Sequence, residues 1–430
     1  MTPRDAAMEI VKALRAHGYQ ALFAGGCVRD MLLGRPAKDY DVATDAEPAD
    51  VIRLFKRTLK VGAQFGVVIV LMDDQGIEVA TFRSDAGYVD GRRPVEVRFT
   101  TAEQDALRRD FTVNGMFYDP VADQVIDYVG GQADLQRRVV RTIGDPADRF
   151  SEDYLRMLRA VRFSTQLGFS MDPATYSAIC ACAPKIVGIS GERISMELEG
   201  ILTCPGRAHG ARALKETGLA AAIFPGMGGD AMQTAVGVLG RLRGRTSYPL
   251  ALAALLVACR SDEALRALKV LKLSRTQTKH VRFLLDRRGV LLQDPLSLAD
   301  LKRLLAGPLF WDLYELQRAI QKAGAGPVGA LVQVRRRVRS LAGVELRPEP
   351  LLNGHDLMRL GMAPGPGLGQ LADQLYGAQL EGVLISVEQA KAWAKRWMAR
   401  RQDTEHRTQN TGAADGGPEA TRGGQMDPKG

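Results

Sequence analysis

The sequence predicts an α+β protein in which strands are confined to the N-terminal region and helices make up the rest. Up to about residue 145, short apolar runs and glycine turns alternate with helical stretches. Beyond about residue 205, apolar residues recur at helical spacing, as in 208–217, 250–258, 262–271, 276–285 and 298–305. A chain of 430 residues is long enough to form several domains.

The composition is that of an ordinary globular protein, with 46% hydrophobic and 25% charged residues. A net charge of +9 suits a polyanionic partner, although charge alone does not distinguish RNA, DNA and a membrane surface. The five cysteines form no CxxC pair, which indicates reduced thiols in a cytosolic (cytoplasmic) protein. The longest apolar run, Leu250–Cys259, is too short to span a bilayer, so no membrane association is expected.

The chain is expected to open with an amphipathic helix rather than a signal peptide. Residues 1–18 are charged and place Ile10, Val11 and Leu14 on one face. Further on, 48–55 is expected to be helical.

The stretch 22–45, LFAGGCVRDMLLGRPAKDYDVATD, contains the first candidate site residues. It is expected to form a strand, a turn at Gly25-Gly26, a short helix, and a second strand carrying Asp39 and Asp41. Carboxylates two apart on a strand point to the same side and repel unless a cation lies between them, and Mg²⁺ favours carboxylate, water and phosphate oxygens. The glycines allow a ligand to approach the backbone closely, and Arg29 suits a phosphate or ribose. Each feature alone is more often a turn or a cap, but together they predict a metal-dependent nucleotidyl-transfer site.

The motif GGCVRDMLLGRPAKDYDVAT resembles the signature of the class II tRNA nucleotidyltransferase (CCA-adding enzyme) and bacterial poly(A) polymerase family, within the DNA polymerase β-like superfamily. The resemblance is strong over about residues 20–202 and weaker beyond. It implies a nucleotidyltransferase head with a small mixed sheet and helices, followed by an all-helical neck, body and tail. We expect a catalytic head at 1–145, a base-recognition neck at 146–205, an RNA-binding body at 206–340, a tRNA-binding tail at 341–401 and a disordered segment at 402–430, which is poor in apolar residues.

Two strands, 67–72 and 77–82, are expected to form a hairpin, with Glu78 in the second strand. Glu78 is either an exposed edge residue or a third catalytic carboxylate, which the superfamily usually carries on an adjacent strand.

The polar, glycine-bearing segment 83–94 is predicted to be a mobile loop. Its Arg92-Arg93 pair either is solvated or contacts nucleic acid. In the family, a loop at this position moves during addition of the terminal A, and its full length here favours competence in that step.

A second motif, LRRDFTVNGMFY at 107–118, resembles a family motif that contacts the nucleotide. The resemblance places Arg109, Asp110 and Asn114 in the nucleotide site, with Asn114 near the sugar. From the residues alone, a network at the end of a helix is an alternative. The segment 125–134 is expected to add a strand and a glycine turn, matching a hinge in the family.

A third motif, DRFSEDYLRMLRAVRF at 148–163, predicts one helix that begins after Ser151 as its N-cap. Asp153, Arg156, Arg159 and Arg162 recur at steps of three and so share a face, which on spacing alone is a solvated surface. In the family, matching residues read the base of the incoming nucleotide.

The resemblance gives these four residues specific roles. Asp153 would accept a hydrogen bond from an exocyclic amine, and Arg156 would donate to a ring nitrogen or carbonyl. C and A carry an amine where U and G carry a carbonyl, so the pair suits CTP and ATP. Arg159 and Arg162 would hold phosphates or brace the pair.

The later motifs are less specific. Gly191–Leu202 resembles the last head-and-neck motif, in which Glu192 and Arg193 brace the preceding helix. Basic runs at 335–337 and 391–401, the second containing Trp393 and Trp397, either bind an RNA backbone or are solvated. LLNGHDLMRLGMAPGPGLG at 351–369 resembles a segment of the tRNA-specific branch, and its His-Asp pair is not expected to bind metal.

The sequence therefore predicts a template-independent enzyme that adds CCA, or part of it such as the terminal A, to tRNA from CTP and ATP. Mg²⁺ ions at Asp39 and Asp41 would support a two-metal-ion transfer. A poly(A) polymerase shares every catalytic motif and is the nearest alternative, against which the 351–369 segment argues. A non-catalytic RNA-binding protein is the alternative from a different class. The intact acidic and base-reading residues argue against it.

Overall fold

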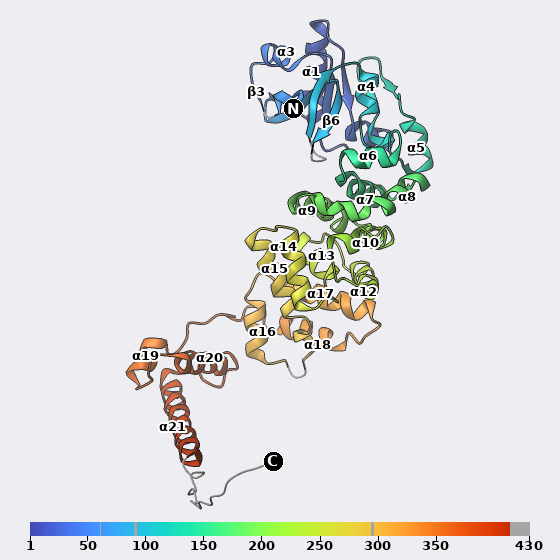
Figure 1. Cartoon of the computed structure of the whole chain (residues 1–430). Helices are drawn as coiled ribbons and strands as arrows, with labels where there is room; N and C mark the ends of the chain where they lie inside the picture. Colours follow the sequence, from blue (N-terminus) through green and yellow to red (C-terminus); the bar gives the residue numbers. More distant parts are fainter. Residues whose placement is uncertain (61, 90–92, 294–295, 413–430) are drawn as a thin grey trace, which may run out of the picture. The chain divides into compact units, whose positions relative to one another are not determined.

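The computed structural model describes residues 1–60, 62–89, 93–293 and 296–412 (Figure 1). These residues form two compact units. The first contains 1–288 and 315–327, and the second contains 289–314 and the chain from 328 onward. Strands lie only in the first unit among the described residues, and helices make up the rest, which confirms the α+β prediction. The finer division into head, neck, body and tail stays a prediction.

A seven-stranded sheet forms the N-terminal part, with the order β3-β4-β5-β2-β1-β8-β9. Within it the pair β2–β5 is parallel and the pairs β1–β2, β1–β8, β3–β4, β4–β5 and β8–β9 are antiparallel, so the sheet is mixed as predicted. Its strands are β1 (Ala21–Ala24), β2 (Asp41–Thr44), β3 (Thr58–Leu59), β4 (Val67–Met72), β5 (Gln75–Thr81), β8 (Phe117–Asp119) and β9 (Gln124–Ile126). The predicted β4–β5 hairpin is confirmed.

Short helices pack on this sheet and connect its strands. The predicted N-terminal helix is confirmed as α1 (Pro3–Ala16), whose Ile10, Val11 and Leu14 are fully buried. Another apolar cluster joins Ala102 and Ala106 to Phe82 and the centre of the sheet. The other elements of this region are α2 (Gly26–Leu32), α3 (Pro48–Leu54), η1 (Ala63–Phe65), α4 (Ala102–Leu107), η2 (Thr112–Asn114) and α5 (Gly131–Arg137).

The segment predicted to be an irregular loop is instead a second hairpin. Strands β6 (Arg83–Val89) and β7 (Arg93–Phe99) pair antiparallel from Arg83 opposite Phe99 to Val89 opposite Arg93. The expectation of a loop rested on polarity and glycine content, but a two-stranded ribbon can contain both because its backbone groups are paired across the strands. Residues 90–92 lie outside the described residues, so the predicted role of Arg92 is not tested.

The predicted helix over 148–163 is broken into α6 (Pro146–Glu152) and α7 (Leu155–Leu167). Asp153 is extended, with φ −155° and ψ 104°, and its side chain accepts the N–H of Leu155 at 3.0 Å. Ser151 is therefore not an N-cap. Helix α6 starts earlier because Asp145 caps it, accepting from the N–H groups of Ala147 and Asp148, and Pro146 suits the first helical turn.

The rest of the first unit is helical apart from short strands β10 (Val139–Val140) and β11 (Ser170–Met171), and it confirms the helices predicted there. The remaining elements are α8 (Pro173–Cys182), η3 (Ala183–Gly188), α9 (Gly191–Leu202), α10 (Arg207–Glu216), α11 (Leu219–Ile223), α12 (Gly229–Leu239), α13 (Tyr248–Leu255), α14 (Ser261–Val270) and α15 (Arg275–Asp286).

The second unit has its own apolar core, in which Trp393 and Trp397 pack against a cluster that includes Leu357 and Leu371. Its elements are η4 (Val290–Leu292), α16 (Leu298–Leu305), α17 (Phe310–Ala323, which continues into the first unit), α18 (Gly329–Ser340), α19 (Gly354–Arg359), α20 (Pro366–Leu380) and α21 (Val387–Gly412). The prediction that the chain is disordered from Gln402 onward is wrong for 402–412, which continue α21. Residues 413–430 lie outside the described residues.

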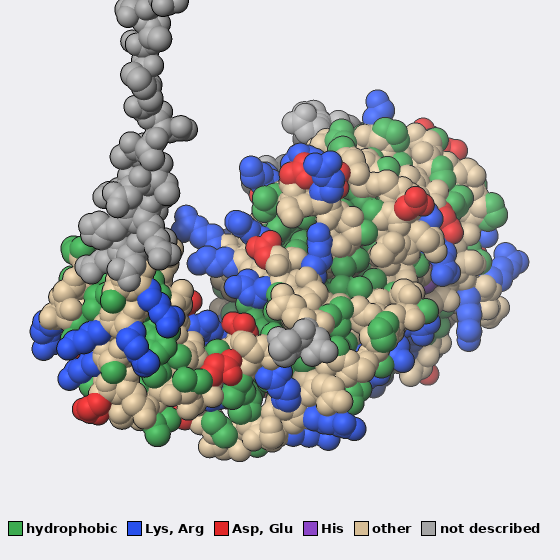
Figure 2. Space-filling model, turned by 90° about the horizontal axis from the view of Figure 1, so that it is seen from below, with side chains coloured by type: hydrophobic (Ala, Val, Ile, Leu, Met, Phe, Trp, Pro, Cys, Tyr) green, Lys and Arg blue, Asp and Glu red, His purple; other side chains and the backbone are tan. Residues whose placement is uncertain are grey.

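Basic side chains are widespread on the surface shown in Figure 2, where acidic side chains are more scattered. This distribution agrees with 58 Lys and Arg residues against 49 Asp and Glu residues in the sequence. No helix within the described ranges is long and apolar enough to cross a membrane.

Candidate active site

A cavity of about 540 Å³ lies among β1–α2, the segment 108–114 and helices α7 and α9. It brings together residues of the first three sequence motifs, which are far apart in the chain. Its lining contains Gly25, Gly26, Arg29, Asp41, Arg108, Arg109, Asp110, Asn114, Asp153, Leu155, Arg156, Arg159, Phe163 and Arg193. Nine of the candidate residues thus share one cavity with Asp41.

The glycine turn and Arg29 form one wall of this cavity. Gly25 has φ 73° and ψ −129°, a conformation open to glycine and unfavourable for other residues. A Cβ at this position would lie 3.3 Å from Nη1 of Arg109 and 3.9 Å from Oδ2 of Asp41. Arg29 donates from Nη1 to Oδ1 of Asn114 at 2.7 Å and from Nε to Asp30 at 2.9 Å. The turn therefore leaves room for a ligand at a place where a side chain would crowd Arg109 and Asp41.

The acidic residues lie beside this wall. Strand β2 begins at Asp41, which pairs with Ala24 at the end of β1, so Asp39 lies in the loop before the strand and not within it as predicted. The ladder stops there because β1 ends at the glycine turn. Glu78 on β5 is exposed and stands one position before the parallel pair Val42–Val79, as Asp41 does on β2. The two carboxylates are therefore neighbours across adjacent strands.

The environment of Asp41 disfavours its charge. Burial raises the pKa of Asp41 to about 6, and the carboxylates of Glu78 and Asp39 add to the rise, while Arg109 opposes it. No cluster of three or more His, Cys, Asp or Glu side chains suited to a metal occurs in the described part of the chain. A pair of carboxylates still fits a cation such as Mg²⁺, which completes its coordination with water and phosphate oxygens. The carboxylates of Asp39, Asp41 and Glu78 repel one another more strongly than Arg109 compensates, which is the reason to expect a cation here.

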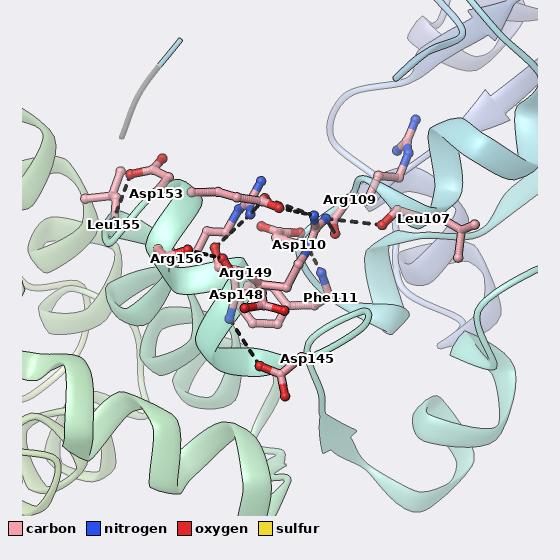
Figure 3. Close-up of polar contacts among 12 residues, drawn as sticks. Leu107, Arg109, Asp110, Phe111, Asp145, Asp148, Arg149, Asp153, Leu155 and Arg156 are labelled. Atoms are coloured by element: carbon pink, nitrogen blue, oxygen red, sulfur yellow. Dashed lines mark hydrogen bonds and ion pairs between the residues drawn. The ribbon is translucent and has the colours of Figure 1, made fainter. Parts of the chain in front are cut away.

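The base-reading candidates Asp153 and Arg156 lie at the junction of α6 and α7 (Figure 3). Oδ2 of Asp153 accepts from Nη2 of Arg193 at 2.6 Å. Arg156 forms an ion pair with Glu152 and donates to the carbonyl of Arg149 at 2.8 Å. Both groups are therefore held in place by neighbours before any ligand contacts them.

Side chains of α6 and α7 also connect the junction to the 107–111 segment, as Figure 3 shows for Arg149. Arg149 donates from Nη2 to the carbonyls of Leu107 at 3.2 Å and Arg109 at 2.7 Å. Arg159 pairs with Asp110, with Nη2 of the arginine 2.6 Å from Oδ2 of the carboxylate. Burial alone would raise the pKa of Asp110, but the Arg159 guanidinium outweighs burial and the pKa is lowered. Asp110 is thus an ionised, structural partner of Arg159.

The fourth residue of the predicted stripe, Arg162, lines a different cavity. This second cavity, of about 690 Å³, shares Gly26, Arg29 and Asp41 with the first. Nε of Arg162 donates to Glu197 at 2.6 Å, and its guanidinium lies 4.2 Å from the ring centroid of Phe163. The other residues of this lining are Cys27, Asp30, Arg35, Pro36, Lys38, Asp39, Gln166, Leu167 and Cys204. Two cavities therefore meet at Asp41, and Asp39 lies in the second.

Some partners in the site were not foreseen from the sequence. Arg193 braces Asp153 as predicted, but Glu192 faces away, is more than half exposed and lies 3.3 Å from Lys272, so its predicted bracing role is wrong. Adjacent helix residues point about 100° apart, so Arg193 can face Asp153 while Glu192 points elsewhere.

The residues that sequence reasoning missed are Asp105, Glu152 and Glu197. An acidic residue one helical turn from an arginine was a readable signal for Asp105 and Glu152, but not for Glu197.

Two family profiles match the chain. Residues 21–141 match the "Poly A polymerase head domain", and residues 168–228 match the "Probable RNA and SrmB-binding site of polymerase A". The first match covers the sheet, the glycine turn and the 107–118 motif.

Curated relatives match over most of their length. A CCA-adding enzyme of Geobacillus stearothermophilus is 36% identical over 416 residues, which cover 94% of this chain and 98% of the relative. A CCA-adding enzyme of Lacticaseibacillus paracasei is 37% identical over 388 residues, which cover 88% of this chain and 92% of the relative.

Solved structures show the same fold. The Bacillus stearothermophilus CCA-adding enzyme in complex with CTP superimposes with a TM-score of 0.77 at 32% identity, covering 94% of this chain and all (100%) of the other. The Thermotoga maritima CCA-adding enzyme complexed with tRNA has a TM-score of 0.65 at 18% identity, covering 93% and 96%, and supports the fold alone.

Proposed function

The chain belongs to the CCA-adding enzyme family, and from this premise we propose how its two cavities carry out nucleotidyl transfer to tRNA. The function is template-independent addition of nucleotides from CTP and ATP to the tRNA 3′ end. The observation that carries it is Asp153, oriented by Arg193 and Leu155 in a cavity that also contains Asp41. A base-reading group and a metal-binding carboxylate in one cavity are what an enzyme needs if protein side chains, not a template strand, select the nucleotide.

The nucleotide occupies the first cavity in this proposal. Its base lies against Asp153 and Arg156, where the carboxylate accepts from the exocyclic amine that C and A share and the guanidinium donates to the base edge. Its phosphates lie toward Arg109, Arg29 and the open backbone of the glycine turn. UTP and GTP present a carbonyl to Asp153, and a carboxylate facing a carbonyl is repulsive.

The RNA 3′ end occupies the second cavity. Arg35, Lys38 and Arg162 in the lining of that cavity are suited to a phosphate backbone, and Asp39 and Asp41 lie in the same lining. Because both cavities include Asp41, a 3′-hydroxyl in one faces an α-phosphate in the other across the carboxylates.

Asp39 and Asp41 would hold the divalent cation, with Glu78 as a third carboxylate on the adjacent strand. Mg²⁺ is the proposed cation because its preference for oxygen ligands and retained waters fits two carboxylates and a triphosphate. Bound there, it would lower the pKa of the 3′-hydroxyl and offset charge on the leaving pyrophosphate. The protein's own contribution is to hold the two substrates in line, with Arg109 and Arg29 on the phosphates.

Basic residues of the helical region would bind the tRNA by its phosphates and shape rather than by sequence. Membership of the CCA-adding enzyme family supports tRNA as the partner. The basic runs at 335–337 and 391–401 are candidates for these phosphate contacts, while Trp393 and Trp397 within the second run pack against their unit's core. A cytosolic location, where tRNA is processed in bacteria, stays a prediction.

The test uses three tRNA transcripts, ending before CCA, after C and after CC, with labelled CTP or ATP and Mg²⁺. Completion of all three, stopping after A, is expected. Activity only on the CC-ended transcript would make the protein an A-adding enzyme, and long A tails on any RNA would make it a poly(A) polymerase.

Variants separate catalysis from binding. Asp39→Ala and Asp41→Ala are expected to abolish incorporation while tRNA binding persists. Asp119→Ala is the matched control, because Asp119 is an acidic head residue whose Oδ2 pairs with Arg15 at 2.7 Å and lines neither cavity. Near-normal incorporation by Asp41→Ala would overturn the assignment, and no incorporation by the unmodified protein would favour a non-catalytic RNA-binding protein.

A further inference from the structure

Helix α4 contains a buried carboxylate, Asp105, that none of the roles above uses. The residue is 1% exposed. Oδ1 accepts from the backbone N–H of Arg83 at 3.2 Å and from Nε and Nη2 of Arg108 at 2.9 and 2.6 Å. Oδ2 accepts from Nε and Nη2 of Arg109 at 3.1 and 2.9 Å. Five N–H groups from three residues thus converge on one carboxylate, which has about four lone-pair sites.

This arrangement keeps Asp105 ionised although it is buried. Burial would raise the pKa of Asp105, but the guanidinium groups of Arg109 and Arg108 outweigh burial, and its pKa lies below the usual range. Arg108 donates two N–H groups to Oδ1 and Arg109 donates two to Oδ2, so each planar guanidinium is held at two points and the carboxylate determines where both arginines point.

Asp105 decides which edge of Arg109 faces the nucleotide cavity. With Nε and Nη2 bound to Asp105, the guanidinium lies 4.9 Å from the ring centroid of Phe117. Nη1 is on the remaining edge, where it lies 3.4 Å from the carbonyl of Asn114 and next to the position a Gly25 Cβ would take. Without the carboxylate, a four-bond side chain that is only 17% exposed would have several other rotamers open to it.

The same carboxylate is bound to the first residue of the β6–β7 hairpin. Asp105 accepts the N–H of Arg83, and Nε of Arg108 donates to the carbonyl of Arg83 at 2.8 Å. The backbone of Arg83 is therefore held on both sides by residues of the α4 segment. If the start of the hairpin moved, the N–H of Arg83 would move with it. That N–H donates to Asp105, which in turn orients Arg109.

We propose that Asp105 is a positioning residue that orients Arg109 for the nucleotide phosphates and couples its orientation to the start of the β6–β7 hairpin. This inference rests on the proposed function, in which Arg109 contacts the nucleotide. Asp105 itself touches no substrate and acts through Arg109.

The test is a double-mutant cycle with Asp105→Asn, Arg109→Ala and the combined variant, measured as nucleotide KM, tRNA KM and kcat for one added C. Asp105→Asn removes the charge and presents N–H groups to the arginines. We expect a rise of roughly 10- to 100-fold in nucleotide KM, as for loss of hydrogen bonds to a charged group, with tRNA KM within about twofold. In the Arg109→Ala background, Asp105→Asn is expected to add less than about threefold.

Two further measurements separate positioning from a general loss of structure. Asp119→Asn removes another carboxylate of the sheet region that pairs with an arginine, and it should leave nucleotide KM unchanged. Hydrogen exchange of the Arg83 amide should accelerate in Asp105→Asn but not in Asp119→Asn. Asp105→Glu keeps the charge, so it should fold and show a smaller rise in nucleotide KM than Asp105→Asn.

The outcomes are distinguishable. An unchanged nucleotide KM in Arg109→Ala would overturn the proposed role of Arg109. A raised KM in Arg109→Ala with normal KM in Asp105→Asn, or multiplicative effects in the double variant, would overturn the inference about Asp105. Unaltered exchange at Arg83 would overturn the coupling to the hairpin.

Discussion

Nη2 of Arg193 lies 2.6 Å from Oδ2 of Asp153, and the two residues are 40 positions apart in the chain. The other oxygen of Asp153 accepts from the N–H of Leu155 at 3.0 Å. Each carboxylate oxygen has two lone pairs, so each can still accept one more hydrogen bond. The contacts therefore fix the direction of the carboxylate without using up its capacity to bind an amine of a nucleobase.

Removing the brace should weaken nucleotide selection. In Arg193→Ala, Asp153 loses one of two restraints, and we expect the preference for CTP over UTP to fall by about tenfold, the effect of one charge-assisted hydrogen bond. Competition between labelled CTP and UTP on a tRNA lacking CCA measures the ratio. Glu192→Ala is the control, because Glu192 is on the same helix but exposed and paired with Lys272. An unchanged ratio in Arg193→Ala would contradict the bracing role.

The glycine turn predicts a second effect. A Gly25→Ala Cβ would meet Nη1 of Arg109 at 3.3 Å in a conformation with positive φ, so we expect incorporation to fall by at least about 100-fold and stability by about 1–3 kcal/mol. Gly34→Ala is a matched control, since Gly34 also has positive φ but nothing lies within 4 Å of its Cβ. Gly34→Ala reports the cost of a positive φ alone, so it should lose some stability and keep its activity, whereas Gly25→Ala should lose both. Equal activities would show that Gly25 serves only the backbone.

Much of this fold was predictable because periodicity and local signals reveal single elements. The N-terminal helix follows from Ile10, Val11 and Leu14 on one face, and the β4–β5 hairpin follows from two apolar runs around a turn. The cavity could be anticipated because its residues lie in motifs that the family resemblance recognises. The motifs do not show which partner each of those residues contacts.

The features that were not predicted arise where two possible helix starts compete, or where two residues far apart in the sequence come into contact. The break at Asp153 arises because Asp145-Pro146 begins a helix early, and a carboxylate two residues before Leu155 then restarts it. Glu197 pairs with Arg162 across 35 residues, a relationship that no local spacing reveals. The β6–β7 hairpin was missed because the pairing of two strands is set by backbone hydrogen bonds between them, which polarity and glycine content do not reveal.

The raised pKa of Asp41 predicts a pH-dependent requirement for the cation. Below about pH 6 the carboxyl is protonated, because burial and the carboxylates of Glu78 and Asp39 favour the neutral form. A cation binds the ionised form and must displace the proton, so its apparent affinity should fall by about tenfold per pH unit below pH 6 and level off above it. Titration of incorporation with Mg²⁺ at pH 5, 6, 7 and 8 tests this. Constant affinity over that range would contradict a raised pKa.

The pair Asp110–Arg159 predicts how stability depends on pH. Arg159 outweighs the effect of burial and lowers the folded-state pKa of Asp110 below the ordinary value of 3.8. A lowered folded-state pKa means that the unfolded chain binds the proton more tightly. The stability from this carboxylate is therefore present above about pH 4 and lost as the pH falls through the lower folded-state value.

Asp110→Asn should accordingly be less stable than the unmodified protein at pH 7, and the difference should shrink below pH 4. Because Arg159 is about one-third exposed (35%) and can rehydrate, we expect a loss of about 1–3 kcal/mol rather than the larger cost of an isolated buried charge. Urea unfolding at pH 7, 5, 4 and 3 measures it. Arg159→Ala and the double variant complete the cycle, in which the coupling between the two residues should disappear at low pH. Coupling that is the same at pH 3 and pH 7 would show that the pair contributes through packing and not through the charge on Asp110.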